Sequence, residues 1–287
     1  MGRFEKLEMK PEGAESTPAM LDSPGTSRKP STETRPGIGE GEGTGFAGLE
    51  PLSGDAVLRA ANDAFYTGDW RQALRHYSRA LQMETTGVEP WVGQVLALLF
   101  LDQVREADIW SRRMLECFPD HPTAVSLSGL VRSLQGMTRS GIGSSDFAMS
   151  KGQADVLCWI VRGWMLLEGG NQNWMHCLDK AVEQCPPDGW RFHLLTGLVL
   201  ERYKKWPQAV KAYQTAVDQK LDNYYLWSRL GHCYDQLGLA RKALEAHQHA
   251  LSLNPDYPPA RKAVDDLSAF PLKTFLRKAV RLFRRNA

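Results

Sequence analysis

The stretch from Trp227 to Pro255, WSRLGHCYDQLGLARKALEAHQHALSLNP, decides the fold of this 287-residue chain. Three of its small residues, Gly231, Ala243 and Ala250, take places that recur along the chain with a period of 34 residues. Counting back from this stretch gives six repeats, which start at residues 54, 88, 122, 156, 190 and 224. A period of this length indicates a repeat architecture, in which each unit buries its apolar face against its neighbours.

Small residues fill three positions in nearly every repeat, and these are the places where two helices must approach each other closely. Position 8 holds Ala61, Val95, Gly129, Gly163, Gly197 and Gly231. Position 20 holds Ala73, Ala107, Gly141, Met175, Ala209 and Ala243. Position 27 holds Ala80, Met114, Ala148, Val182, Ala216 and Ala250. Because the same phase is kept through all six repeats, the pattern predicts the fold specifically.

The sixth repeat resembles the tetratricopeptide repeat family, because it carries nearly every residue of the family's W-x2-L-G-x2-Y…A…A…P pattern. Those residues are Trp227, Leu230, Gly231, Tyr234, Gly238, Ala243, Ala250 and Pro255. The resemblance implies two antiparallel helices per repeat, with the proline ending the second helix. The expected fold is an all-α, right-handed α-solenoid of about six 34-residue helix-turn-helix repeats over residues 54–257.

Three further segments flank the repeats. Residues 1–53 contain 9 Gly and 6 Pro, and this composition predicts a disordered leader that cannot bury enough apolar surface to offset its ordering entropy. Residues 258–270 are expected to form a capping helix, which repeat arrays need at their ends. Residues 271–287 are expected to form a separate basic amphipathic helix, because Pro271 suits a first helical turn.

The third and fourth repeats depart from the pattern. In the third, residues 136–152 contain four Gly and four Ser, which predicts a loop or a short, weak helix where the second helix should be. In the fourth, residues 168–173 shift the pattern by one residue, so that Leu178 and Ala181 are expected to replace positions 24 and 27. Two interpretations are open, a functional loop and a degenerate repeat that only bends the solenoid.

Nothing in the sequence predicts catalysis, because no Ser/His/Asp arrangement or pair of carboxylates stands out. The nearest candidate for a metal site comprises His176, Cys177, Cys185 and His193, whose spacing matches no zinc signature. The five cysteines are odd in number and widely spaced, as expected of free thiols. We therefore expect no enzymatic activity, no metal and no cofactor.

Charge and hydropathy limit the protein's location and partners. No segment is apolar over the roughly 20 residues that a membrane helix needs, and charges in the first ten residues argue against a secretory signal. The formal net charge is +2, and residues 271–287 hold six Lys or Arg and no Asp or Glu. The remaining chain has no positive excess, so nucleic acid is not an expected partner. These features predict a cytoplasmic protein.

In tetratricopeptide arrays the ligand groove typically lies on the concave face formed by the first helices. Carried over to this chain, the resemblance implies a partner-binding groove formed by Leu58, Asn62, Phe65, Val92, Leu96, Leu99, Leu130, Ile160, Trp164 and Leu167. Repeats 2 and 4 give this groove an unusually apolar floor, and an exposed apolar face is normally covered by something. Two occupants are open, a peptide or helix of a protein partner and the chain's own residues 136–153.

One subclass of the family binds a C-terminal carboxylate through a clamp of Lys, Asn and Arg side chains. Asn62 matches one position of that clamp, but Leu58 stands where the first Lys should be. Gly93 replaces the second Asn, and Thr123 and Leu127 replace the basic pair. The carboxylate clamp is therefore absent from this sequence.

The basic helix expected over residues 271–287 carries its charges on one side and apolar residues on the other. The charged residues are Lys273, Arg277, Lys278, Arg281, Arg284 and Arg285. Three interpretations are open: a last helix that caps the array, an anchor on an anionic membrane surface, and a site for an acidic protein or nucleic acid.

Together these features predict a non-catalytic scaffold or adaptor that binds a partner peptide or helix in the groove. Peripheral attachment to an anionic membrane is one use of its basic end. The alternative is a self-associating repeat protein that builds a homo-multimeric assembly.

Overall fold

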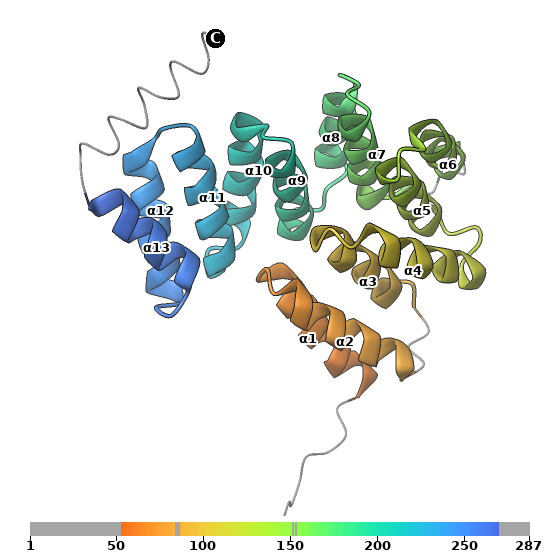
Figure 1. The fold of residues 1–287 in the computed structure, drawn as a ribbon, viewed down its shortest axis with the longest axis horizontal. Coiled ribbons are helices and arrows are strands. Elements are labelled where there is room, and N and C mark those ends of the chain that lie inside the picture. The colour runs from red at the N-terminus through yellow and green to blue at the C-terminus, as the bar shows by residue number, and fades with distance from the viewer. Residues whose placement is uncertain (1–52, 84–86, 151, 153, 270–287) are drawn as a thin grey trace, which may run out of the picture. The chain divides into compact units, whose positions relative to one another are not determined.

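The computed structural model describes residues 53–83, 87–150, 152 and 154–269, and within them the chain forms thirteen α-helices and no strand (Figure 1). The helices are α1 (Gly54–Tyr66), α2 (Trp70–Gln82), α3 (Glu89–Phe100), α4 (Val104–Cys117), α5 (Pro122–Leu134), α6 (Thr138–Ser150), α7 (Val156–Glu168), α8 (Trp174–Glu183), α9 (Trp190–Arg202), α10 (Trp206–Gln219), α11 (Tyr224–Gln236), α12 (Ala240–Leu253) and α13 (Pro258–Ser268). The prediction of an all-α fold is confirmed.

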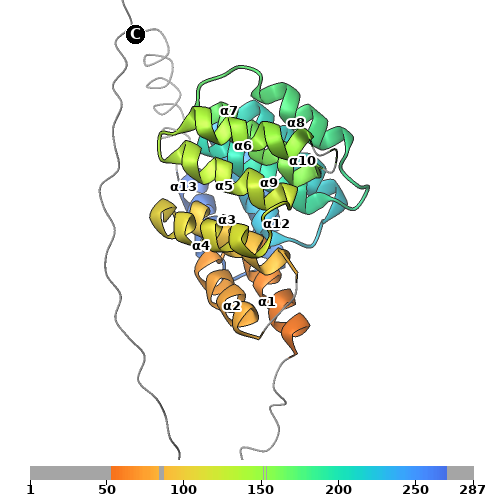
Figure 2. The same cartoon turned by 90° about the vertical axis from the view of Figure 1, so that its right-hand side faces the viewer.

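The helices pack as six consecutive pairs, from α1 with α2 to α11 with α12, and α13 packs on α12. The first helices of the pairs begin at residues 54, 89, 122, 156, 190 and 224, within one residue of the repeat starts expected from the sequence. Figure 2 shows α5, α6 and α7 side by side, and each of these three helices contacts the other two. This pairwise packing is the α-solenoid that the 34-residue period predicts.

Glycine at position 8 lets the second helix of a pair lie directly against the first. A Cβ atom on Gly197 would lie 2.5 Å from the ring of Tyr213, and a Cβ atom on Gly231 would lie 2.9 Å from the ring of His247. Carbon atoms in a packed interior do not approach so closely, so no larger residue fits without moving the second helix. The ring at position 24 therefore rests on the bare backbone at position 8.

A residue with positive φ at position 15 turns the chain from the first helix of each pair to the second. The six residues are Gly68, Asp102, Gly136, Gly170, Lys204 and Gly238, with φ between 57° and 89°. Glycine adopts this left-handed backbone without steric cost, whereas other residues are strained there. In four of the six pairs, glycine at this position therefore allows the turn without backbone strain.

The second helix of the third pair is complete, and the prediction of a loop or a short, weak helix over residues 136–152 was wrong. Residues Thr138–Ser150 form α6, which is as long as α5. A Cβ on Gly129 would lie 2.7 Å from the Gly141 carbonyl oxygen, so the two backbones nearly touch. Glycine and serine are poor helix formers in isolation, but here tertiary packing overrides that propensity.

The one-residue shift expected in the fourth pair is present. Trp174 is buried while Met175, which stands at position 20, is 49% exposed. Leu178 lies against Gly163, where an added Cβ would come within 2.7 Å of its tip. Ala181 is also buried, so the buried residues of α8 are one position earlier than those of its counterparts.

The predicted disordered leader over residues 1–53 lies outside the described residues except for its last residue, Ser53, whose side chain caps α1. The predicted basic helix over residues 271–287 also lies outside them. The last described helix is α13, which follows the sixth pair.

Candidate partner-binding surfaces

The ten predicted groove residues, here called the inner face, all lie on the first helices α1, α3, α5 and α7. Leu58, Asn62 and Val92 are half-buried, and the other seven are buried. Trp164, at the centre of the predicted apolar floor, is 0% exposed. The chain's own side chains cover the inner face in this structure, and the role of these residues in partner binding stays a prediction.

Side chains from the second and fifth repeats cover Trp164 of the fourth. The ring centroids of Phe100 and Trp164 are 5.4 Å apart, and Trp164 Nε1 donates a hydrogen bond of 3.0 Å to the hydroxyl of Tyr203. That hydroxyl donates in turn to the carboxylate of Glu168. Burial, and then the neighbouring Glu168, raise the pKa of Tyr203 above its usual value. The hydroxyl therefore stays protonated and keeps its place as a donor.

The end of α1 contacts the fifth and sixth repeats directly. The rings of Tyr66 and Trp190 have centroids 5.4 Å apart and meet edge to face. The guanidinium of Arg191 lies 5.1 Å from the centre of the Tyr66 ring, within the range of cation–π attraction. Gly68 lies against Tyr225, because an added Cβ would come within 2.3 Å of that ring. The end of the first repeat thus lies against the start of α9 and the start of α11.

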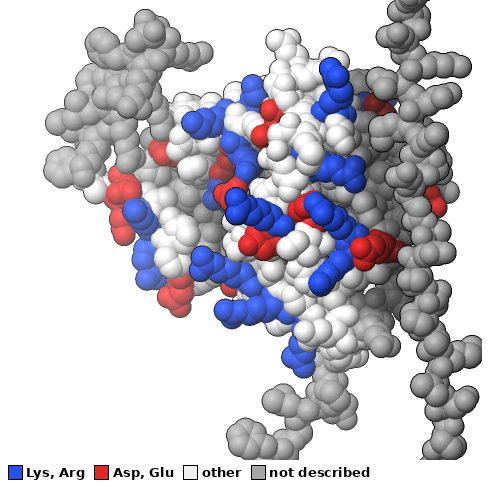
Figure 3. Space-filling view, turned by 45° about the vertical axis from the view of Figure 1, so that its right-hand side comes forward, with Lys and Arg blue, Asp and Glu red and all other residues white. Residues whose placement is uncertain are grey.

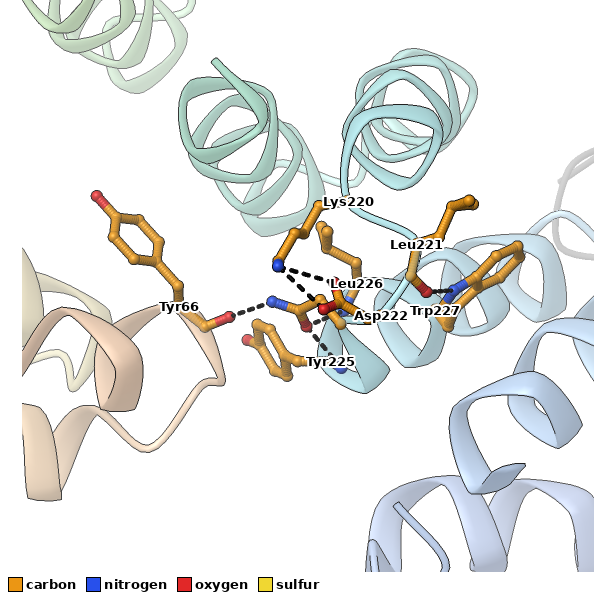
Figure 4. Close-up of polar contacts among 8 residues, drawn as sticks. Tyr66, Lys220, Leu221, Asp222, Tyr225, Leu226 and Trp227 are labelled. Carbon is orange, nitrogen blue, oxygen red and sulfur yellow. Dashed lines mark hydrogen bonds and ion pairs between the residues drawn. The ribbon is translucent and has the colours of Figure 1, made fainter. Parts of the chain in front are cut away.

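Asn223 adds a hydrogen bond to this contact while it caps α11. Its Oδ1 accepts hydrogen bonds from the backbone N–H groups of Tyr225 and Leu226, at 2.9 Å and 3.1 Å. Its Nδ2 donates a hydrogen bond of 3.2 Å to the carbonyl of Tyr66 (Figure 4). The last carbonyls of a helix have no partner within the helix, so Asn223 satisfies one of them. We call the following set the closing contact: Tyr66, Gly68, Trp190, Arg191, Asn223 and Tyr225.

The turn before α11 is held in place by its own side chains (Figure 4). Lys220 Nζ donates to Asp222 Oδ2 at 3.1 Å, and this bond lowers the pKa of the Asp222 carboxyl. The indole Nε1 of Trp227 donates to the carbonyl of Leu221 at 2.8 Å. Asn223 therefore directly follows a turn that is connected by two side-chain hydrogen bonds.

The fourth pair leaves an open slot on the side of the second helices. In the described array α2, α4, α6 and α10 each pack on the first helix of the next repeat and α12 packs on α13, but α8 does not pack on α9 in this way. The α8 helix has only 10 residues, because it starts late at Trp174 and because Pro186 and Pro187 follow its end. The result is a cavity of about 480 Å³ between α8, α9 and α10, which we call the slot.

The slot has an apolar stripe along α8. Met175, Leu178 and Val182 line it, and Val182 is 52% exposed. Asp179 and Glu183 also line it from α8. The slot was not predicted from the sequence. Its signal there is Met175, which takes a position that a small residue holds in the other five repeats.

A buried carboxylate joins the fifth pair to the sixth. Glu201 is 9% exposed and accepts hydrogen bonds from the Tyr213 hydroxyl at 2.8 Å and from Arg229 Nε at 3.0 Å. His232 Nε2 lies 3.5 Å from its other oxygen. A buried charge needs such partners, and losing one would leave it uncompensated. These contacts give Glu201 a structural role between three helices.

Between α11 and α13 lies a second cavity, of about 370 Å³, which His247 lines from α12. The imidazole of His247 is 4% exposed, and its Nδ1 has no hydrogen-bond partner. Burial, and to a smaller extent the nearby His232, lower the pKa of His247 to about 4. The ring is therefore neutral at physiological pH.

Metal sites, membrane spans and charged patches are three further possibilities for the described part of the chain. No group of three or more His, Cys, Asp or Glu residues there is placed to hold a metal ion. No described helix is both long and apolar enough to cross a membrane. On the face drawn in Figure 3, Lys and Arg side chains are interspersed with Asp and Glu side chains. This face therefore offers no single-signed patch of the kind that binds nucleic acid.

A family model described as tetratricopeptide repeat matches residues 204–258. This range contains α10, α11 and α12, which include the stretch whose pattern led to the resemblance. The chain carries tetratricopeptide repeats, and the prediction from the sequence is confirmed. No curated protein matches the chain in sequence.

Several solved structures resemble the chain at low identity. A TPR protein with an unusual peptide-binding site, YrrB, is 18% identical with a TM-score of 0.39, and the match covers 65% of this chain and 96% of that one. The human IFIT1 dimer with PPP-AAAA is 16% identical with a TM-score of 0.49, and the match covers 75% of this chain and 52% of that one. These low values do not connect the ligands of either protein with this chain.

Proposed function

We propose that this chain is a non-catalytic scaffold that binds a segment of a protein partner. The observation that carries the proposal is the slot, where Met175 and Val182 are about half exposed beside the buried Leu178. Adjacent exposed apolar side chains that line a cavity are typical of interaction sites. Tetratricopeptide repeats in general serve protein–protein interaction, which agrees with this use of the array.

The slot suits the apolar side chains of a helix or of an extended segment. Met175, Leu178 and Val182 are spaced along one stripe of α8, so a partner's apolar side chains would lie along it. Asp179 and Glu183 border the stripe, although Lys180 pairs with Glu183 at 2.7 Å. A partner segment with a basic residue beside its apolar ones would therefore match the slot best.

Substitution of Val182 by Asp tests the proposal, with Ile109→Asp as the matched control. Val182 is 52% exposed within the slot, and Ile109 is 54% exposed on α4, away from it. Full-length variants are cross-linked in native lysate and the captured proteins are quantified by mass spectrometry. Burying an unpaired carboxylate against a partner should lower the specific capture by about tenfold or more.

A partner lost from Val182→Asp and retained by Ile109→Asp supports binding in the slot, provided both variants keep the wild-type melting temperature. Equal capture by both variants contradicts it. Light scattering over a concentration series separates the alternative, a self-associating assembly, because the mass of such an assembly rises with concentration.

The predicted basic helix over residues 271–287 extends the proposal to an anionic membrane surface, and this part rests on the sequence alone. Six basic residues without an acidic one would be attracted to anionic lipid, with each contributing about 1 kcal/mol near the surface. The full chain should sediment with anionic vesicles at low salt and less at high salt, where charges are screened. A variant with Arg277, Lys278, Arg281 and Arg284 changed to Glu should remain in solution. Failure of the wild type to sediment at any salt concentration contradicts membrane binding.

A further inference from the structure

Trp164 lies where separate parts of the array meet. Phe100 covers it from the second repeat, and Tyr203 covers it from the fifth. An ion pair of 2.6 Å between Asp102 and Arg202 joins the same two repeats. The apolar floor of the inner face is therefore accessible only if the second repeat moves away from the fifth.

The first and second repeats are joined to each other by aromatic packing. Phe100 stacks on Trp70 with ring centroids 5.1 Å apart, and it meets Phe65 at 5.9 Å. A displacement of the first repeat would therefore carry Phe100 with it. The closing contact holds the end of α1 on α9 and α11, so it is one of the contacts that keep the first repeat, and Phe100 with it, close to the fifth repeat.

The closing contact is made of few interactions. It contains one hydrogen bond, from Asn223 to Tyr66, one edge-to-face ring pair, one cation–π contact and the packing of Tyr225 against Gly68. Most adjacent repeats, by contrast, are joined by a second helix that packs on the next first helix, with the fourth and fifth repeats as the exception. Contacts of this limited kind are the first to open in a repeat protein, because each repeat otherwise depends only on its neighbours.

We infer that the closing contact is a latch, and that its release uncovers the inner face for a partner's apolar segment. In the closed form the chain itself occupies the position that such a segment would take on Leu99 and Trp164. A partner that binds only the open form shifts the chain toward that form. Its apparent association constant is the intrinsic one multiplied by the fraction of molecules that are open. The latch thus regulates one of the chain's two candidate partner surfaces.

The consequence for partners rests on the proposed scaffold function, but the latch itself can be measured without any partner. Two glycines at the same repeat position form a matched pair for this purpose. Gly68 has φ of 81° and Gly238 has φ of 77°. A Cβ on Gly68 would clash with Tyr225, whereas a Cβ on Gly238 would have no atom within 4 Å. Alanine strains both turns equally and disturbs the closing contact only at Gly68.

Hydroxyl-radical footprinting of the full-length protein, with mass spectrometry as the readout, measures how accessible each side chain is. We expect oxidation of Trp164 and Trp190 to become several-fold faster in Gly68→Ala and to stay at the wild-type rate in Gly238→Ala. Trp110 on α4 serves as an internal reference. A rise in Gly238→Ala as large as in Gly68→Ala overturns the inference, because backbone strain would then explain both.

Asn223→Asp removes the hydrogen bond to the Tyr66 carbonyl without removing the cap of α11. Aspartate still accepts the backbone hydrogen bonds that begin α11, but it has no N–H to donate and places an oxygen opposite the Tyr66 carbonyl. Faster oxidation of Trp164 in this variant, at an unchanged helical content, supports the latch even if Gly68→Ala fails to fold. Wild-type oxidation rates in Asn223→Asp overturn it. Because no partner is present, this result is independent of whether the slot binds one.

Discussion

The fourth and fifth pairs begin alike and end differently. Each has a glycine at position 8 of its first helix, Gly163 in α7 and Gly197 in α9. In the fifth pair the ring of Tyr213 rests on that glycine, and its hydroxyl donates to the buried Glu201. In the fourth pair the smaller Leu178 takes this place, one position early along α8.

The difference decides which surfaces remain available. The α10 helix packs on the next first helix, α11, whereas α8 does not pack in this way on α9. The apolar residues that would be buried in a regular pair, Met175 and Val182, are about half exposed as a result. A shift of one residue in one helix thus converts part of a packed array into a candidate binding surface.

Alanine substitution at the two glycines should separate these pairs most strongly. We expect Gly197→Ala to lower the free energy of unfolding by about 3 kcal/mol, because its Cβ would lie 2.5 Å from a fully buried tyrosine ring. Gly163→Ala should cost about 1 kcal/mol or less, since its Cβ meets the flexible tip of Leu178, and α8 borders the open slot. Urea denaturation of the two full-length variants measures both effects.

Equal destabilisation by Gly163→Ala and Gly197→Ala would show that α8 is held as firmly as α10. In that case the slot would be a rigid cavity, and it would not be a place where the array has room to adjust. The slopes of the denaturation curves should match the wild type, because neither variant alters the surface exposed on unfolding.

The sixth pair provides a comparison that depends on pH, because His247 holds the place of Tyr213. The pKa of this imidazole is lowered from 6.5 to about 4 in the folded chain. The unfolded chain therefore binds a proton at a higher pH than the folded one does, and stability falls as pH drops from 6.5 toward 4. Between pH 7 and pH 5 we expect a loss of about 2 kcal/mol from this residue.

His247→Tyr recreates the arrangement of the fifth pair and removes the titrating group. The wild type should lose more stability than the variant as pH falls from 7 to 5, so the unfolding free energy of the variant minus that of the wild type should increase. His193, whose pKa is also lowered by burial, is common to both proteins and cancels in the comparison. A difference that is independent of pH would mean that His247 is solvated and titrates normally.

The sequence predicted the helix pairs because their packing is local. Small residues at position 8 and large ones at position 24 lie within a single repeat, so a period of 34 residues reveals which faces meet. The same reasoning failed for α6, since the propensity of Gly and Ser argued against a helix that packing against Gly129 stabilises.

The surfaces were harder to predict than the pairs. The closing contact joins Tyr66 to Trp190 and Asn223 across four repeats, and no pattern with a 34-residue period identifies such partners. The inner face was predicted from positions in the repeat. These positions say which side of a first helix a residue lies on, but they do not say which side chains cover that residue. The slot arises because α8 packs weakly on α9, and the exposed Met175 at position 20 is the one trace of this in the sequence.

The third pair gives the smallest and most local test, because α6 carries two glycines in opposite environments. Gly143 is exposed, and a Cβ there would have no atom within 4 Å, so Gly143→Ala should stabilise the protein by about 0.5–1 kcal/mol through helix propensity alone. Gly141→Ala should instead destabilise it, because the new Cβ would lie 2.4 Å from the carbonyl oxygen of Gly129. Thermal melts of the two variants should move in opposite directions. If both alanines raise the melting temperature, α6 is a helix whose backbone does not rest on α5 at Gly129.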